Sequence, residues 1–165
     1  LEMLYILNKE TVSSLDDNLQ ALELQSGPDK PEITYNAHVY AFYYIYFAKI
    51  TDGVLTKEEL QTIADKIVLW VMNDFPRDQL EAKVRTIVQE SKQWYDSLDP
   101  KARKEEIIKM CDWLKTHLSG FGDYHKDFLQ DLVDIARADE NFSEKEKDLI
   151  LHTAEQWGIE FDVDG

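Results

Sequence analysis

The chain has 165 residues, with 33 acidic and 18 basic side chains and a formal net charge of −15. This length is enough for one domain with a hydrophobic core, and a hydrophobic content of 44% excludes a disordered acidic tail. Because phosphate backbones and anionic lipid repel so acidic a protein, we expect no nucleic-acid partner and no direct membrane insertion. The single cysteine, Cys111, permits no internal disulfide and no cysteine metal cluster, which fits a cytoplasmic protein.

The first segment, residues 1–31, is predicted to be an N-terminal helical extension and linker ahead of a helical domain over residues 32–165. Apolar residues recur in it at the spacing of one helix face: Val12, Leu15, Leu19, Leu22 and Leu24. Turn-forming residues from Gly27 to Pro31 then separate this segment from the rest. It carries six acidic and two basic side chains.

The remaining chain is predicted to be all-α, with roughly seven helices in total. Turn signals at four places divide stretches that have helical spacing: Asp52-Gly53, Phe75-Pro76, Asp99-Pro100 and Gly120 to Gly122. The aromatic and β-branched run from Val39 to Phe47 would also suit a strand, but its uninterrupted length favours a helix. The uncharged stretch is too short to cross a membrane, which takes about 20 residues.

An internal repeat organises this domain. Residues 35–72 align with residues 122–159 at an offset of 87, without a gap. His38 aligns with His125, Asp52 with Asp139, and Glu59 with Glu146; Trp70 aligns with Trp157. Each half reads as helix, acidic turn and helix, so we expect two copies packed about a pseudo-twofold axis. Residues 76–120 would bridge the copies as two helices.

The repeated turn runs from Asp52 to Glu59 and from Asp139 to Glu146, and two interpretations of it stay open. Thr56 with Glu59, and Ser143 with Glu146, have the spacing of capping boxes that begin a helix. Alternatively the carboxylates bind a divalent cation, as the second half of an EF-hand loop would. A conventional EF-hand is excluded, because residues such as Ala48 and Arg137 occupy the positions of its first ligands.

Two histidines are candidates to complete such a cation site. His38 and His125 each precede the aspartate of their own turn by 14 residues, about 21 Å along a helix. If the repeats pack antiparallel, His38 would approach Asp139 and Glu146, and His125 would approach Asp52 and Glu59. The predicted metal ligands are therefore Asp52, Glu59, Asp139, Glu146, His38 and His125. The alternative is that both histidines are capping or surface residues.

Catalytic motifs are absent from the sequence, which contains no H-E-x-x-H, P-loop, nucleophile elbow or G-x-G-x-x-G. Cys111 stands in an apolar helical pattern and is interpreted as a buried filler. The spacing of the tyrosine-rich helix predicts that most of it is core, and Tyr40 and Tyr44 on its second face are candidates for a partner surface. The basic cluster Lys101, Arg103 and Lys104 is another candidate. We predict that the protein is not an enzyme.

The two turns resemble the paired turns of TerB-like domains, named for bacterial tellurite resistance. The resemblance rests on Phe47 to Glu59 and on Ile135 to Glu146, and it covers about residues 35–160. It departs from the family pattern at Glu140, which stands where a glycine would favour a left-handed turn. It implies an all-helical, pseudo-symmetric cytoplasmic domain that acts in protein complexes of stress-response systems. It also implies metal binding at Asp52, Glu59, Asp139 and Glu146.

Together these observations predict a non-enzymatic TerB-like module whose acidic turns bind Ca²⁺, Mg²⁺, Mn²⁺ or Zn²⁺. The expected partners are other proteins, membrane-associated stress-response components among them, and a homodimer stays open. The first alternative is a protein–protein adaptor without metal. The second is a metal-dependent enzyme.

Overall fold

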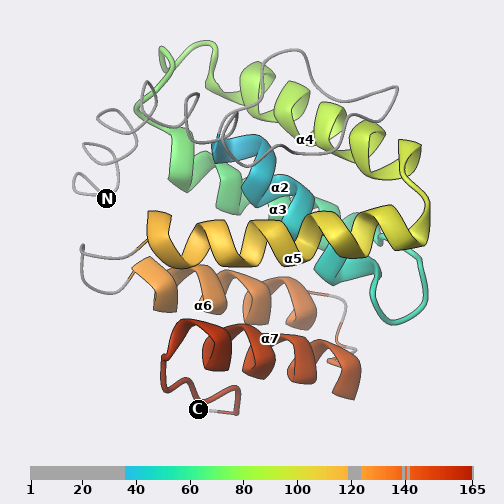
Figure 1. Ribbon diagram of the computed structural model, residues 1–165. Coiled ribbons are helices and arrows are strands. Elements are labelled where there is room, and N and C mark those ends of the chain that lie inside the picture. The colour runs from blue at the N-terminus through green and yellow to red at the C-terminus, as the bar shows by residue number, and fades with distance from the viewer. Residues whose placement is uncertain (1–35, 119–123, 139, 141, 165) are drawn as a thin grey trace.

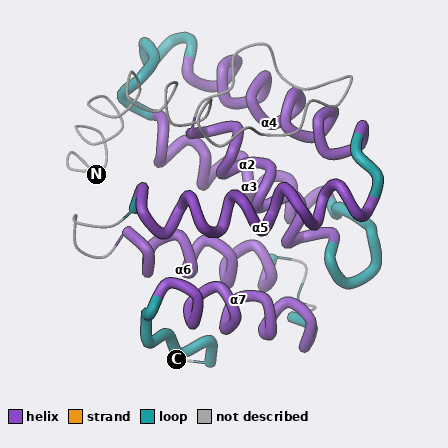
Figure 2. The backbone as a smooth tube through the Cα atoms, viewed as in Figure 1, coloured by secondary structure: helices purple, strands orange, loops and turns teal. Residues whose placement is uncertain are grey.

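The computed structural model describes residues 36–118, 124–138, 140 and 142–164. Six α-helices and no strand occur in these ranges: α2 (Asn36–Lys49), α3 (Lys57–Val71), α4 (Leu80–Ser97), α5 (Pro100–His117), α6 (Tyr124–Arg137) and α7 (Glu144–Trp157). The all-α prediction is therefore confirmed (Figure 2). The extension over residues 1–31 lies outside the described residues, as does the turn at Gly120 to Gly122.

The predicted turns fall between the helices. Asp52 and Gly53 separate α2 from α3, and the bridge over residues 76–120 contains the two expected helices, α4 and α5. Asp99 caps α5 by accepting a hydrogen bond from the Ala102 amide at 2.8 Å, and Pro100 fills the first helical position. The run from Val39 to Phe47 is helical, so its length decided against a strand. No described helix is both long and apolar enough to span a bilayer.

Helix α2 is the centre of the molecule. It packs against all five of the other described helices, with α4 on one side and α6 and α7 on the other (Figure 1). Twelve of its fourteen residues are buried, because apolar and aromatic side chains occur on every face of this helix. A helix of this kind is stable only when it is enclosed on all sides.

Aromatic side chains of α2 make its contacts with three neighbouring helices. Tyr40 packs on Trp70 of α3 with ring centroids 4.8 Å apart, and Phe42 packs on Trp94 of α4 at 4.6 Å. Tyr43 meets Phe128 of α6 edge-on at 5.3 Å. Such pairs contribute about 0.5–1.5 kcal/mol beyond the area that they bury.

The predicted tyrosine surface on α2 is wrong. Tyr40 is 1% exposed and Tyr44 is 0% exposed. The sequence pattern suggested a core face and a second, outward face, but α2 is surrounded by helices and has no outward face for these rings. Tyr40 and Tyr44 therefore belong to the core and present no surface to a partner.

The burial of Ile63 on α3 and the exposure of Leu151 on α7 predict different losses of unfolding free energy when each is replaced by alanine. Ile63→Ala removes a fully buried side chain and should lower the free energy of unfolding by about 2–5 kcal/mol. Leu151→Ala on α7 removes one that is 46% exposed and should change it by no more than about 0.5 kcal/mol. Urea denaturation of both variants measures this, and equal losses would contradict the described packing.

Candidate functional site

The two acidic turns are capping boxes at the start of α3 and α7. Thr56 Oγ1 accepts a hydrogen bond from the Glu59 amide at 3.1 Å, and Glu59 Oε1 accepts one from the Thr56 amide at 2.9 Å. Ser143 and Glu146 repeat the arrangement at 3.2 and 2.9 Å. The capping interpretation is confirmed. Glu59 and Glu146 are 2% and 3% exposed, so both carboxylates lie beneath the surface of their turns.

Each acidic turn begins with an aspartate, Asp52 in the first and Asp139 in the second. Asp52 is exposed, and its Oδ1 accepts a hydrogen bond from the Val54 amide at 2.9 Å, which closes a local turn. Asp139 lies outside the described residues. The next position is left-handed in both turns: Gly53 has φ 75° and Glu140 has φ 62°. The left-handed conformation is therefore kept at Glu140, where the second copy has no glycine.

The two turns also touch each other. Thr51 Oγ1 and Ser143 Oγ share a hydrogen bond at 2.5 Å, so the end of α2 lies against the start of α7. Ser143 is also the capping residue of α7. This contact places the two acidic turns side by side at one end of the molecule.

The structure gives each predicted histidine ligand another neighbour. His38 is 2% exposed, and its Nε2 lies 3.6 Å from Glu90 Oε1 on α4. Burial lowers the pKa of His38, although the nearby Glu90 carboxylate opposes this. His125 Nε2 lies 3.0 Å from the Lys115 carbonyl oxygen on α5, and its ring packs 5.1 Å from that of Trp157.

A preassembled metal site is not found in the part of the chain that the structure describes. Within it, no three His, Cys, Asp or Glu side chains are grouped so that they could hold a metal ion. Asp139 is outside this part, so metal ligation by Asp52, Glu59, Asp139, Glu146, His38 and His125 stays a prediction.

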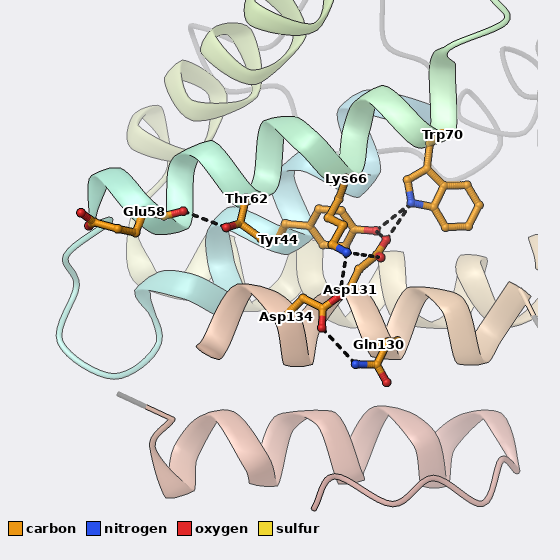
Figure 3. Close-up of polar contacts among 8 residues, drawn as sticks. All are labelled: Tyr44, Glu58, Thr62, Lys66, Trp70, Gln130, Asp131 and Asp134. Atoms are coloured by element: carbon orange, nitrogen blue, oxygen red, sulfur yellow. Dashed lines mark hydrogen bonds and ion pairs between the residues drawn. The ribbon is translucent and has the colours of Figure 1, made fainter. Parts of the chain in front are cut away.

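A buried carboxylate joins three helices elsewhere in the core. Asp131 Oδ2 on α6 accepts hydrogen bonds from Tyr44 Oη on α2 at 2.6 Å and from Trp70 Nε1 on α3 at 2.9 Å (Figure 3). Lys66 Nζ on α3 lies 3.8 Å from Asp131 Oδ1 and donates to Asp134 Oδ2 at 2.6 Å. These contacts fix the register of α6 against α2 and α3.

Charge and burial oppose each other in this network. Burial raises the pKa of Asp131 to about 6, although Tyr44, Trp70 and Lys66 favour its charged form. Partial burial works against the charge of Lys66, but Asp134 and Asp131 together raise the pKa of that ammonium group. Burial also raises the pKa of Tyr44 far above its usual value, so its hydroxyl stays a donor.

Comparison with known proteins identifies the family. The family model for tellurite resistance protein TerB matches residues 46–162. The chain belongs to the TerB family. The match includes both capping boxes and, from the Asp131 network, Lys66, Trp70 and Asp131, and it confirms the resemblance seen in the paired turns. No curated protein and no solved structure matches the chain.

Sequence reasoning missed the Asp131 network of this TerB domain. Two signals point to it. Asp131 falls three residues after Phe128 and four before Ile135, in the buried stripe of α6, where a carboxylate needs a partner. It also aligns with Tyr44 at the repeat offset of 87.

The turns of the TerB domain predict opposite effects for two substitutions. Gly53→Ala puts a Cβ on a left-handed residue and should destabilise the fold by about 1–2 kcal/mol. Glu140→Gly relieves the same strain and should stabilise the fold by up to about 1 kcal/mol, since a more flexible unfolded chain offsets part of the gain. Thermal unfolding of both variants measures this. Destabilisation by Glu140→Gly would contradict the left-handed conformation.

Asp131 predicts a specific pH dependence. Because its folded-state pKa exceeds the value near 3.9 of an exposed aspartate, the folded chain binds this proton more tightly than the unfolded chain. The stability that the group contributes is complete below about pH 4 and is lost as pH rises through about 6. The difference in unfolding free energy between wild type and Asp131→Asn should fall across that window.

Taking this difference cancels the titration of all other carboxyl groups that the substitution leaves alone. Tyr44→Phe removes a donor that favours the charged carboxylate, so the folded-state pKa of Asp131 should rise in this variant. The pH range over which the stability contributed by Asp131 is lost should then move to higher pH. Urea titrations at a series of pH values supply both measurements. A difference that is flat between pH 4 and 6 would refute the assignment.

Proposed function

We propose that this chain is a non-catalytic binding module of the TerB family whose two adjacent acidic turns bind a divalent cation. The observation that carries the proposal is the contact between Thr51 and Ser143, which puts the turns side by side. Described carboxylates from both halves of the chain, those of Asp52, Glu59 and Glu146, belong to these two turns, and Asp139 precedes Glu140 of the second turn in sequence. Neither turn alone offers enough ligands for a hard cation, which takes six or more oxygens.

Electrostatics and turn geometry narrow the kind of cation. Residues 121–165 hold thirteen acidic and four basic side chains, so the field of the second half attracts cations. Oxygen ligands favour Ca²⁺, Mg²⁺ and Mn²⁺, whereas Zn²⁺ prefers histidine nitrogen, and His38 lies 11 residues, about 17 Å along α2, from Lys49 next to the turns. Glu59 and Glu146 each use Oε1 in a cap, so a cation there would share the carboxylate with the helix.

Two features support a role without catalysis. The sequence lacks the motifs of the enzyme classes considered, and burial raises the pKa of the half-buried Cys111 thiol, which opposes the reactive thiolate. The module would then act by binding, within a bacterial stress-response or tellurite-resistance system in the cytoplasm. Its partners would be other proteins, including membrane-associated components of that system.

We also propose that the fold arose by internal duplication. Both halves contain a helix, a left-handed turn position, a capping box and a second helix. Tyr44 and Asp131, which align at the repeat offset, hydrogen bond to each other. Equivalent residues meet in this way next to a twofold axis.

A metal-free adaptor would have to bind its partner through fewer of the surfaces that the sequence suggested. Tyr40 and Tyr44 are buried, and Arg103 lies over the Tyr95 ring at 4.2 Å while its Nε donates to the Tyr95 carbonyl. Lys101 and Lys104 remain exposed on α5. A homodimer is compatible with either function.

Thermal unfolding of chelator-treated protein tests the cation proposal. At 100 times its dissociation constant, a cation that binds only the folded chain stabilises it by about 2.7 kcal/mol, or several degrees in Tm. We expect one of Ca²⁺, Mg²⁺, Mn²⁺ and Zn²⁺ to give this shift. Asp52→Asn/Asp139→Asn should abolish it while preserving the turns, since asparagine forms the same turn.

Glu155→Gln/Glu160→Gln provides the matched control, because both side chains are exposed and the change in charge is the same. Glu155 lies about 16 Å along α7 from Glu144 at its acidic start. The control variant should keep the full shift. If no ion shifts Tm, or if Asp52→Asn/Asp139→Asn keeps the shift, the turns are helix caps alone.

A further inference from the structure

An apolar groove lies between α3 and α4. It has a volume of about 700 Å³. Its floor is formed by two rows of three residues: Leu60, Ala64 and Val68 of α3, and Leu80, Val84 and Val88 of α4. Within each row the residues are four apart, so each row follows one face of its helix. Val84 and Val88 are the most buried of the six, at 3% and 6% exposed.

The size and chemistry of the groove suit a third helix. Between Lys57 and Val68 the α3 wall is about 17 Å long, or three helical turns. The charged residues along it are Lys57, Arg77 and Arg85 against Asp65 and Glu81. This rim is therefore net positive in a chain whose net charge is −15. An acidic amphipathic helix is the partner that these features fit.

The first segment of the chain itself has this chemistry. Val12, Leu15, Leu19 and Leu22 are spaced three, four and three residues apart, which places them on one face of a helix about 15 Å long. Residues 1–31 carry six acidic and two basic side chains. Both the length of the apolar row and the sign of the charge match the groove.

The start of α2 lies close to one end of the groove. Ser91 Oγ on α4 donates to the His38 carbonyl at 3.4 Å, and His38 lies beside Glu90. These contacts are within one turn of Val88, the last of the three apolar groove residues of α4. Residues 25–35 span up to about 36–40 Å when extended, so residues 12–24 can reach the whole groove.

We propose that residues 12–24 of this chain dock as an amphipathic helix in the α3/α4 groove. Tethering favours this occupant over a second copy, since a linker of this length gives an effective concentration near the millimolar range. A second copy would also bring another charge of −15 and be repelled. The docked segment would cover the apolar side chains of the groove.

Cysteine cross-linking in the 165-residue chain tests the proposal. In a Cys111→Ser background, Leu19→Cys and Ala64→Cys are joined with a short bis-maleimide and analysed by gel and peptide mass spectrometry. We expect an intramolecular product in several-fold excess over that of the control pair Leu19→Cys and Leu151→Cys, which places the second thiol at an exposed site on α7.

A disrupted variant separates docking from tethered proximity. Leu15→Asp/Leu22→Asp, added to the Leu19→Cys/Ala64→Cys pair, should reduce the product to the control level. A yield that this change leaves intact would overturn the proposal, as would equal yields from the two cysteine pairs. A product of dimer size only would also overturn it and assign the groove to a second copy.

Discussion

The enclosure of α2 is the constraint on which the rest of the fold depends. With tyrosine, phenylalanine and aliphatic side chains on all faces, this helix cannot lie at a surface without exposing a large apolar area. Five helices surround it, and their aromatic partners, Trp70, Trp94 and Phe128, come from three of them. The surrounding helices bury one face against α2 and carry charged side chains on the other. Those outer faces hold many of the acidic residues that give the chain its net charge of −15.

The buried carboxylate of Asp131 makes this packing specific. Apolar contacts around α2 tolerate small shifts, whereas the contacts with Tyr44 and Trp70 each require defined geometry. A carboxylate that lost its partners in the core would cost several kcal/mol, so α6 is held in one register. The raised pKa of Asp131 is a consequence of the same burial. Specific packing and sensitivity to mildly acidic pH thus have one cause.

The capping boxes give the acidic turns two potential uses that compete. Glu59 and Glu146 already satisfy backbone donors, and each cap contributes on the order of 1 kcal/mol. A cation that bound these carboxylates would have to share them with the helix starts, whereas Asp52 is exposed and closes only a short turn. In the proposed cation site, binding and helix capping would therefore depend on the same side chains.

Local features of this protein were predictable from the sequence. The helices, both capping boxes and the turn at Asp52-Gly53 depend on residues within four positions of one another, so their spacing along the chain reveals them. The partners of His38, the burial of Tyr40 and the network of Asp131 depend on which helices meet. Residues far apart in sequence form them, and only the packing around α2 decides which faces are buried. The sequence by itself determined where helices begin and end, while the tertiary structure decided which side chains they bring together, because those contacts are set by long-range burial.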